Sequence, residues 1–192
     1  MGMTDLSRSA LILVDIQNDF LPGGALAVPD GDSILRAVNA LARLPFRAVI
    51  ATQDWHPLHH CSFRTEGGPW PSHCVAGTHG ADFPDTLFPE PVTHIVRKGV
   101  LKDRDSYSGF LDNDRATSTG LDGLLQGLGI NHVVVCGLAL DYCVMATALD
   151  AVGCGYQTDV IPEACRGIAA DPKATLEKLE KQGVLLKSVN AF

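Results

Sequence analysis

The feature that most constrains this chain is the regular alternation of short apolar runs with amphipathic segments. Residues 9–16 read SALILVDI, a nearly continuous apolar run of the kind that parallel strands show when both faces are buried. Further runs of this type lie at 47–52, 93–97, 131–136, 156–161 and 184–189. Segments with the apolar spacing of a helix separate them, at 32–44, 121–128, 142–152 and 172–182. The alternation predicts an α/β fold, a three-layer αβα sandwich around a mostly parallel sheet of about six strands.

The size and composition are typical of one packed domain. The chain has 192 residues, of which 46% are hydrophobic and 19% charged, and a domain typically holds about 100–200 residues. We therefore expect a single domain over residues 1–192. The formal net charge is −7 and the lysine and arginine residues are scattered along the chain, which argues against nucleic acid as a partner.

Sequence signals favour a cytoplasmic location. The longest apolar runs, such as 133–136, fall far short of the roughly 18 residues that span a bilayer. Residues 1–6 read MGMTDL, with an acid where a secretion signal carries bases. We therefore predict a cytoplasmic protein without membrane contact, in which the six cysteines are free thiols.

Chemically active residues stand where the predicted strands end. Asp15 closes the first strand, Asp54 and Lys98 follow the second and third, and Cys143 lies at the start of the helix after the fourth. In an open α/β sheet, chemistry gathers beyond the carboxyl ends of the strands, so we expect these side chains to converge. The segment 55–91, rich in proline and histidine, is predicted to be a loop at the same end, and a loop of this length is usually functional.

A thiol, a carboxylate and an ammonium at these strand ends indicate nucleophilic catalysis. A helix N-terminus lowers the pKa of a thiol such as Cys143 and offers free N–H groups to an oxyanion. Asp15 could take the thiol proton and pass it to a leaving amine, and Lys98 would stabilise both charges. From the spacing alone, Cys143 fits a small buried side chain equally well, and Asp15 fits a turn cap.

The loop after the second strand has the residues of a metal site. Asp54 and His56 lie close together in extended backbone, and a distant histidine such as His73 can complete the set of ligands. A structural zinc on the His-Cys pairs at 60–61 and 73–74 is a weaker interpretation, because adjacent residues in an extended chain point in opposite directions. Ordinary polar loop residues are the third alternative.

Taken together, the motifs resemble those of a known family. They read VDIQNDF at 14–20, TQDWHP at 52–57, HCSF at 60–63, WPSHCV at 70–75, KG at 98–99, DSYSGF at 105–110 and GLALDYCV at 137–144. With these motifs the chain resembles, over nearly its whole length, the nicotinamidase/pyrazinamidase branch of the isochorismatase-like hydrolases.

The resemblance implies a cysteine amidohydrolase that converts nicotinamide to nicotinate and ammonia, a step of NAD salvage and pyridine nucleotide biosynthesis. Pyrazinamide, converted to pyrazinoate, is implied as a further substrate. In the implied mechanism Cys143 attacks the carboxamide carbon and forms a thioester, Asp15 transfers the protons and Lys98 supports both charges. The N–H groups of Ala139 and Cys143 would hold the oxyanion, and the Leu138–Ala139 peptide is expected to be cis.

The resemblance also implies a metal cofactor. One divalent ion, usually zinc with iron or manganese as alternatives, would bind to Asp54, His56 and His73. His60 matches a position that ligates the metal in some members of the family only. The ion would bind the pyridine nitrogen or order water, and it would not activate the nucleophile.

The implied substrate is a small nicotinamide-like carboxamide. Phe20, Trp70 and Tyr107 match the aromatic walls that sandwich a flat ring. The sequence leaves open whether the chain forms a homo-oligomer. Three alternatives to this function are a cysteine amidase for carbamoylated amines, a non-catalytic metal-binding domain, and a hydrolase whose metal generates the attacking water. The complete metal set argues against the first, and the complete set of thiol, carboxylate and ammonium argues against the second.

Overall fold

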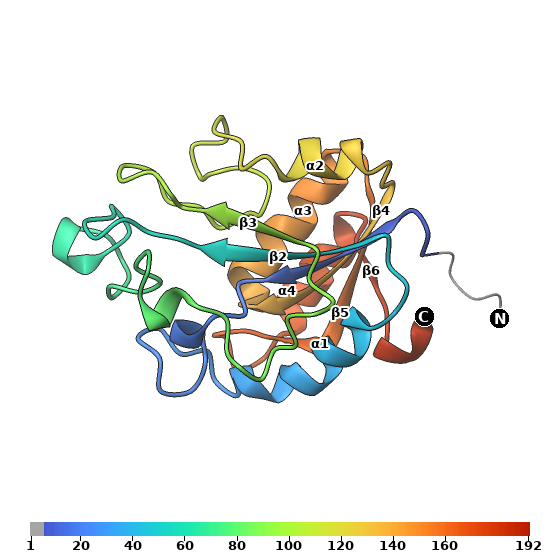
Figure 1. Ribbon diagram of the computed structural model, residues 1–192, viewed down its shortest axis with the longest axis horizontal. Coiled ribbons are helices and arrows are strands. Elements are labelled where there is room, and N and C mark those ends of the chain that lie inside the picture. The colour runs from blue at the N-terminus through green and yellow to red at the C-terminus, as the bar shows by residue number, and fades with distance from the viewer. Residues whose placement is uncertain (1–5) are drawn as a thin grey trace.

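Six parallel strands form one sheet in the computed structural model, which describes residues 6–192 (Figure 1). Their order across the sheet is β3-β2-β1-β4-β5-β6. The strands are β1 (Ser9–Val14), β2 (Ala48–Asp54), β3 (His94–Lys98), β4 (His132–Leu138), β5 (Gln157–Arg166) and β6 (Leu185–Leu186). Every neighbouring pair of these strands is parallel, so the sheet is wholly parallel where the sequence predicted a mostly parallel one.

Helices cover both faces of this sheet. In the described residues they are α1 (Leu35–Ala42), α2 (Leu121–Gly127), α3 (Met145–Gly153) and α4 (Lys173–Lys181). Figure 1 shows α1 below the strands and α2 above them. All residues of the central strands β1 and β4 are buried, because a parallel strand between two helical layers has no face in water. The predicted α/β class, a three-layer αβα sandwich, is confirmed.

One strand boundary differs from the sequence prediction for a physical reason. β5 runs on to Arg166 instead of ending before Pro162. The ladder between β4 and β5 shifts its register between Val135 and Gly137, and a residue without an N–H group is tolerated where strand pairing is interrupted. The proline therefore lies inside the strand without costing a ladder bond.

The strand order reverses between β1 and β4, and this reversal places the site. In open α/β sheets, ligands bind beyond the carboxyl ends of the strands at such a switch point. Asp15 follows β1, and the turn that carries Cys143 follows β4, so the two residues enter the same crevice. Figure 1 shows the first part of the loop 55–91 beyond the same ends of β2 and β3, at the left of the view, before the chain runs back beneath the strands to the start of β3.

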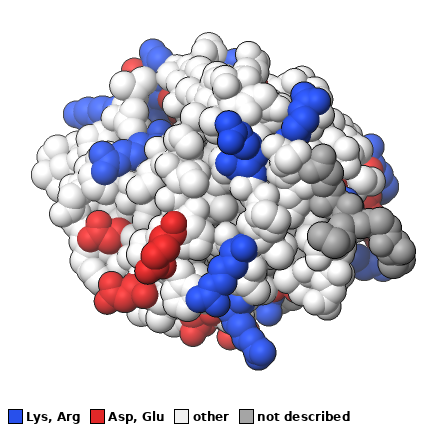
Figure 2. Space-filling model, turned by 45° about the vertical axis from the view of Figure 1, so that its right-hand side comes forward, with Lys and Arg blue, Asp and Glu red and all other residues white. Residues whose placement is uncertain are grey.

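The surface carries dispersed charge. On the face in Figure 2 the lysine and arginine side chains are spread out instead of forming one continuous patch, and acidic side chains gather at the lower left. Within residues 6–192, the helices are all too short or too polar to cross a bilayer. Residues 1–5, on which most of the argument against a secretion signal depends, lie outside the described residues.

Candidate active site

Three side chains converge in the crevice from three different strand ends. Asp15 follows β1, Lys98 is the last residue of β3, and Cys143 lies after β4 in a π-helical turn, Leu140–Val144. Lys98 Nζ lies 2.9 Å from Asp15 Oδ2 and 3.6 Å from Cys143 Sγ. All three residues are buried. The structure thus brings together the thiol, the carboxylate and the ammonium that the sequence singled out.

Asp15 is held in an uncommon backbone conformation. Its φ of 48° lies in the left-handed region, which residues with a side chain rarely adopt and which is often found at functional sites. The Thr52 hydroxyl donates to Asp15 Oδ1 at 2.6 Å, and the Asp15 N–H donates to Thr52 Oγ1 at 3.1 Å. Oδ2 pairs with Lys98 and has no hydrogen-bond partner among the described residues, so it is the oxygen that can accept a further proton.

Burial and the neighbouring charges together shift the pKa values of these three groups. It raises the pKa of the Cys143 thiol well above its ordinary value, although Lys98 opposes the shift. Burial also raises the pKa of Asp15. For Lys98, burial favours the neutral amine, but the Asp15 and Asp54 carboxylates outweigh it and raise the pKa well above its ordinary value. The direction of the thiol shift is opposite to the lowering of the thiol pKa that was expected from a helix N-terminus.

The turn before Cys143 has an unusual backbone. The Leu138–Ala139 peptide is cis, as expected. The N–H groups of Tyr142 and Val144 donate to the Ala139 carbonyl at 3.0 and 3.1 Å. Among the backbone hydrogen bonds of residues 6–192 outside the helices and strands, the Ala139 N–H donates none, and the Cys143 N–H follows it within the same turn. A free N–H beside a nucleophile is one donor of the kind that an oxyanion hole requires.

Asp54, His56 and His73 form a second cluster beside the first. One ligand atom of each residue lies within 4.8 Å of the others. His56 Nδ1 hydrogen bonds to the Gly99 carbonyl at 2.9 Å, which leaves Nε2 facing Asp54 Oδ2 at 3.5 Å. This Nε2 atom is buried and has no hydrogen-bond partner among the described residues. A carboxylate and two imidazoles around such an orphaned nitrogen fit a divalent metal ion.

Backbone carbonyls orient both imidazoles of the cluster. His73 Nδ1 hydrogen bonds to the Pro71 carbonyl at 2.7 Å, as His56 Nδ1 does to Gly99, and metal-binding histidines commonly donate their second nitrogen in this way. Gly99 has a φ of +61°, and a Cβ there would lie 2.4 Å from His56 Cε1. Only glycine therefore fits beside the His56 ring.

His60 packs on the cluster but has both ring nitrogens engaged. Its ring stacks on His56 with the centroids 4.0 Å apart. His60 Nδ1 lies 2.7 Å from the Ser62 hydroxyl, and Nε2 lies 2.8 Å from the Arg104 carbonyl. A second group of potential ligands joins His60 to His56 and Asp105, but His60 would have to give up one of these bonds to bind an ion. Its role as a ligand stays a prediction.

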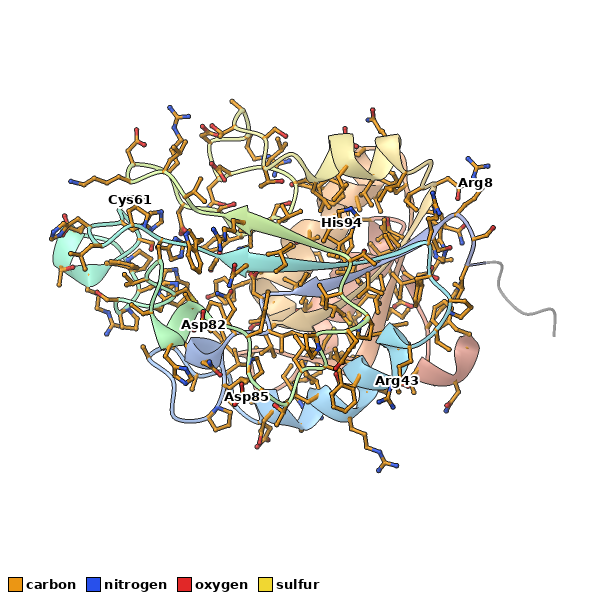
Figure 3. The ribbon with its side chains drawn as sticks, in the orientation of Figure 1. Arg8, Arg43, Cys61, Asp82, Asp85 and His94 are labelled. Carbon is orange, nitrogen blue, oxygen red and sulfur yellow. The ribbon has the colours of Figure 1, made fainter. Side chains whose placement is uncertain are left out.

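Cysteines take no part in either group of potential ligands found among the described residues. The structural zinc on the two His-Cys pairs therefore has no support from the geometry. Figure 3 shows Cys61 in the loop beyond the carboxyl ends of the strands, and His94 at the start of β3, toward the other end of the sheet. All six cysteines are free, as the sequence predicted.

Lys98 joins the two clusters. It donates to Asp54 Oδ1 at 2.5 Å and to the Ser106 carbonyl at 2.8 Å, in addition to pairing with Asp15. Burial opposes ionisation of Asp54, but Lys98 and His56 outweigh it and hold the pKa of that carboxyl well below its usual range. Asp54 is therefore a carboxylate with one oxygen on Lys98 and the other facing His56.

A largely apolar pocket opens onto both clusters. Its lining includes Cys143 and the predicted Phe20, Trp70 and Tyr107. Trp70 Nε1 donates to the Tyr107 hydroxyl at 3.2 Å. Both rings meet Tyr142 edge to face, with centroid distances of 5.3 and 5.7 Å. The three aromatic residues predicted to hold a flat ring thus line one pocket with the thiol, and Tyr142 of the catalytic turn adds a fourth.

Sequence reasoning missed residues that hold the backbone of the metal-ligand segment in place. Gln17 accepts the Asp54 N–H through Oε1 and donates through Nε2 to the Asp54 carbonyl, both at 2.8 Å. Asp19 Oδ2 accepts the N–H of Cys74, the residue after His73, at 2.7 Å. Gln17 and Asp19 both stand in the VDIQNDF motif. Their place in a polar motif directly after a buried strand is the signal that could have identified them.

Comparisons with known proteins agree with the site. Residues 9–189 match the isochorismatase domain family. The nicotinamidase of Escherichia coli (strain K12) is 42% identical over 182 residues, which cover 85% of each chain. The crystal structure of PnC1 from L. infantum in complex with nicotinate is 41% identical with a TM-score of 0.95, and the match covers 99% of this chain and 97% of that one.

A structure with a metal also matches. The crystal structure of the pyrazinamidase of Pyrococcus horikoshii in complex with zinc is 42% identical with a TM-score of 0.86, and the match covers 94% of this chain and 99% of that one. The family match and these identities extend over most of the chain. The chain therefore belongs to the isochorismatase family, in its nicotinamidase/pyrazinamidase branch.

Proposed function

We propose that this protein hydrolyses nicotinamide to nicotinate and ammonia through a thioester on Cys143, and that it also converts pyrazinamide to pyrazinoate. The relatives support the substrate, since they are nicotinamidases and pyrazinamidases. One observation carries the mechanism. Cys143 Sγ, Lys98 Nζ and Asp15 meet beside an aromatic pocket that is also lined by Asp54 and His73.

In the first half of the reaction, Cys143 Sγ attacks the carboxamide carbon while Asp15 Oδ2 takes the thiol proton. The carbonyl oxygen becomes an oxyanion, which the N–H groups of Ala139 and Cys143 would hold. When the tetrahedral adduct collapses, the C–N bond breaks and Asp15 gives its proton to the leaving nitrogen. Ammonia departs and a thioester remains on Cys143.

In the second half, a water molecule attacks the thioester carbon and gives a proton to Asp15. The C–S bond then breaks, the sulfur recovers the proton from Asp15, and the carboxylic acid leaves. Asp15 thus accepts and returns a proton twice, for which a buried carboxyl with a raised pKa is suited. Lys98 keeps its charge throughout and stabilises the thiolate and the carboxylate in turn.

Asp54, His56 and His73 would hold one divalent ion, which we propose to be zinc, with iron or manganese as alternatives. When bound, the ion supplies a Lewis-acid anchor for a ring nitrogen. The protein's own residues orient the ring: Phe20 packs against His73, with their ring centroids 5.7 Å apart, and Trp70 with Tyr107 forms another part of the pocket wall.

Acid-quench mass spectrometry tests the thioester. Mixed rapidly with nicotinamide, the wild-type protein should gain the mass of one nicotinoyl group on Cys143 and release ammonia. Cys143→Ala should fold, retain the same metal content and show neither. Ammonia release at a near wild-type rate by Cys143→Ala, or turnover without any adduct even at the shortest times, would instead favour a metal-activated water as the nucleophile. Assaying ammonia release from carbamoylated amines tests the alternative of a cysteine amidase for those substrates.

The cytoplasmic location, the single domain and the oligomeric state stay predictions from the sequence. Peptide mapping after treatment with iodoacetamide complements the mass experiment. Loss of activity should follow the labelling of Cys143 while the metal content is unchanged, whereas labelling of the exposed Cys154 alone should leave activity intact.

A further inference from the structure

We propose that Asp141 is a positioning residue that holds the segment after β5 against the catalytic turn, so that Ile168 limits the size of the ring the pocket accepts. This inference rests on the proposed carboxamide hydrolysis for its substrate. Asp141 lies two residues before Cys143, in the turn Leu140–Val144.

The carboxylate of Asp141 binds this segment with both oxygens. The Ile168 N–H donates to Asp141 Oδ1 at 3.0 Å, and the Ala169 N–H donates to Oδ2 at 2.8 Å. Within residues 6–192, these are the hydrogen bonds that Ile168 and Ala169 make. Bonds from a carboxylate to backbone N–H groups are roughly twice as strong as neutral ones. Asp141 is therefore the tether of this segment.

The backbone of Gly167 lies directly against the same carboxylate. A Cβ at Gly167 would lie 2.9 Å from Asp141 Oδ1 and 3.2 Å from Asp141 Cγ, which is closer than ordinary van der Waals contact. The three residues 167–169 thus wrap the end of one side chain. This close approach fixes the distance between the segment and the turn that carries the nucleophile.

Ile168 stands between two hollows. On one side it lines the substrate pocket together with Cys143, Tyr142 and Ala139. On the other side it lines a separate cavity of about 440 Å³, whose walls include Leu140 and Arg166. The side chain is 41% exposed. A wall with empty space behind it is not held by packing, so the tether from Asp141 decides how far Ile168 projects toward the ring.

The sheet explains why one side chain can reach both elements. Leu138 at the end of β4 pairs with Arg166 at the end of β5, so the catalytic turn and the tethered segment leave the sheet side by side. Asp141 then spans 27 positions in the sequence to reach Ile168. The contact therefore fixes the position of Ile168 in the pocket wall relative to the Cys143 thiol.

The first test is hydrogen exchange on Asp141→Ala, because it needs no substrate. The amides of Ile168 and Ala169 should lose their protection, while the amides of α3 should not change. Asp171→Ala is the matched control: Asp171 also accepts a backbone N–H, from Lys173 at 2.9 Å, but lies outside both hollows. Asp141→Asn retains one acceptor oxygen and should therefore protect one amide of the pair. It replaces the alanine variant in this test if Asp141→Ala does not fold.

The second test is discrimination between nicotinamide and a larger fused-ring amide, quinoline-3-carboxamide. In Asp141→Ala the ratio of kcat/KM for the two amides should fall about tenfold, through a higher KM for nicotinamide with little change in kcat, since a misfit of one methylene in a pocket costs about 10–200-fold. Ile168→Ala should lower the ratio in the same direction while the Ala169 amide stays protected.

Two results would overturn the inference. One is exchange at Ile168 and Ala169 that matches the Asp171→Ala control, and the other is an unchanged ratio in both Asp141→Ala and Ile168→Ala. A wild-type protein that cleaves no nicotinamide would refute the proposed function instead, and the exchange experiment would still decide whether Asp141 is the tether.

Discussion

Replacing Lys98 by methionine removes the one charge that both clusters share, and its effect on stability can be worked from the structure. Lys98 Nζ lies 2.9 Å from Asp15 Oδ2 and 2.5 Å from Asp54 Oδ1, and its side chain is completely buried. At an effective dielectric constant near 20, each attraction is worth about 6 kcal/mol. Because the buried ammonium also has a desolvation cost that the variant avoids, the net loss is smaller, about 3–5 kcal/mol.

Urea unfolding of Lys98→Met with chelator present throughout gives the measurement, since a bound ion would stabilise either protein by mass action. With an m-value of about 2 kcal/mol/M, a loss of about 4 kcal/mol lowers the midpoint by about 2 M. Methionine matches the length of the lysine stem, so the change reports mainly the charge.

Lys173→Met is the control with the same substitution. Lys173 pairs with Glu177 at 4.0 Å, and both side chains are well exposed, so the free energy of unfolding should change by less than about 0.5 kcal/mol and the midpoint by less than about 0.25 M. The reasoning is refuted if Lys98→Met moves the midpoint no more than this control does, because two buried carboxylates would then coexist without their counter-ion at no cost.

Three further predictions concern the surroundings of the clusters. Gly99→Ala should lower the metal content several-fold and destabilise the fold by more than about 1 kcal/mol, because a Cβ would meet the His56 ring. The control Gly155→Ala, also at positive φ but with open space around it, should keep its metal. Equal metal loss in both variants would exclude the steric cause. Thr52→Val should lower kcat about tenfold with KM unchanged in steady-state kinetics, since Asp15 loses its hydroxyl donor. An unchanged kcat would contradict a role of Thr52 in orienting Asp15. Removing the metal with a chelator should lower Tm by several degrees and zinc should restore it; calorimetry without any shift would argue against an ion in this cluster.

The sheet and the ends of its strands were predictable because local signals carry them. The run at 9–16 is too apolar for a surface strand, and Asp15 ends it. Once the strands are parallel, their carboxyl ends share one edge, so Asp15, Asp54 and Lys98 had to lie near one another. No long-range information was needed for that step.

The electrostatics and the contacts behind the site were not predictable in this way. The helix predicted from residue 142 begins as a π-helical turn at Leu140, and burial reverses the expected shift of the Cys143 thiol pKa. The bond between Asp141 and Ile168 depends on the β4–β5 register. A single sequence does not reveal which residues 27 positions apart will face each other, and it does not show how deeply a thiol is buried.

The geometry of the sheet also explains why the ammonium is supplied by a lysine at the end of β3. β2 lies between β3 and β1, and neighbouring strands are about 4.8 Å apart, so a side chain from β3 must reach across about 10 Å of sheet to act beside β1. The Lys98 stem covers part of that distance by passing over the end of β2, where Asp54 stands as its register partner, and the Asp15 side chain meets it from the other side. The contact between Lys98 and Asp54 is thus a consequence of the path that Lys98 takes to Asp15 and Cys143. A shorter cation at this position would pair with Asp54 alone and leave Asp15 and the thiol without their counter-charge.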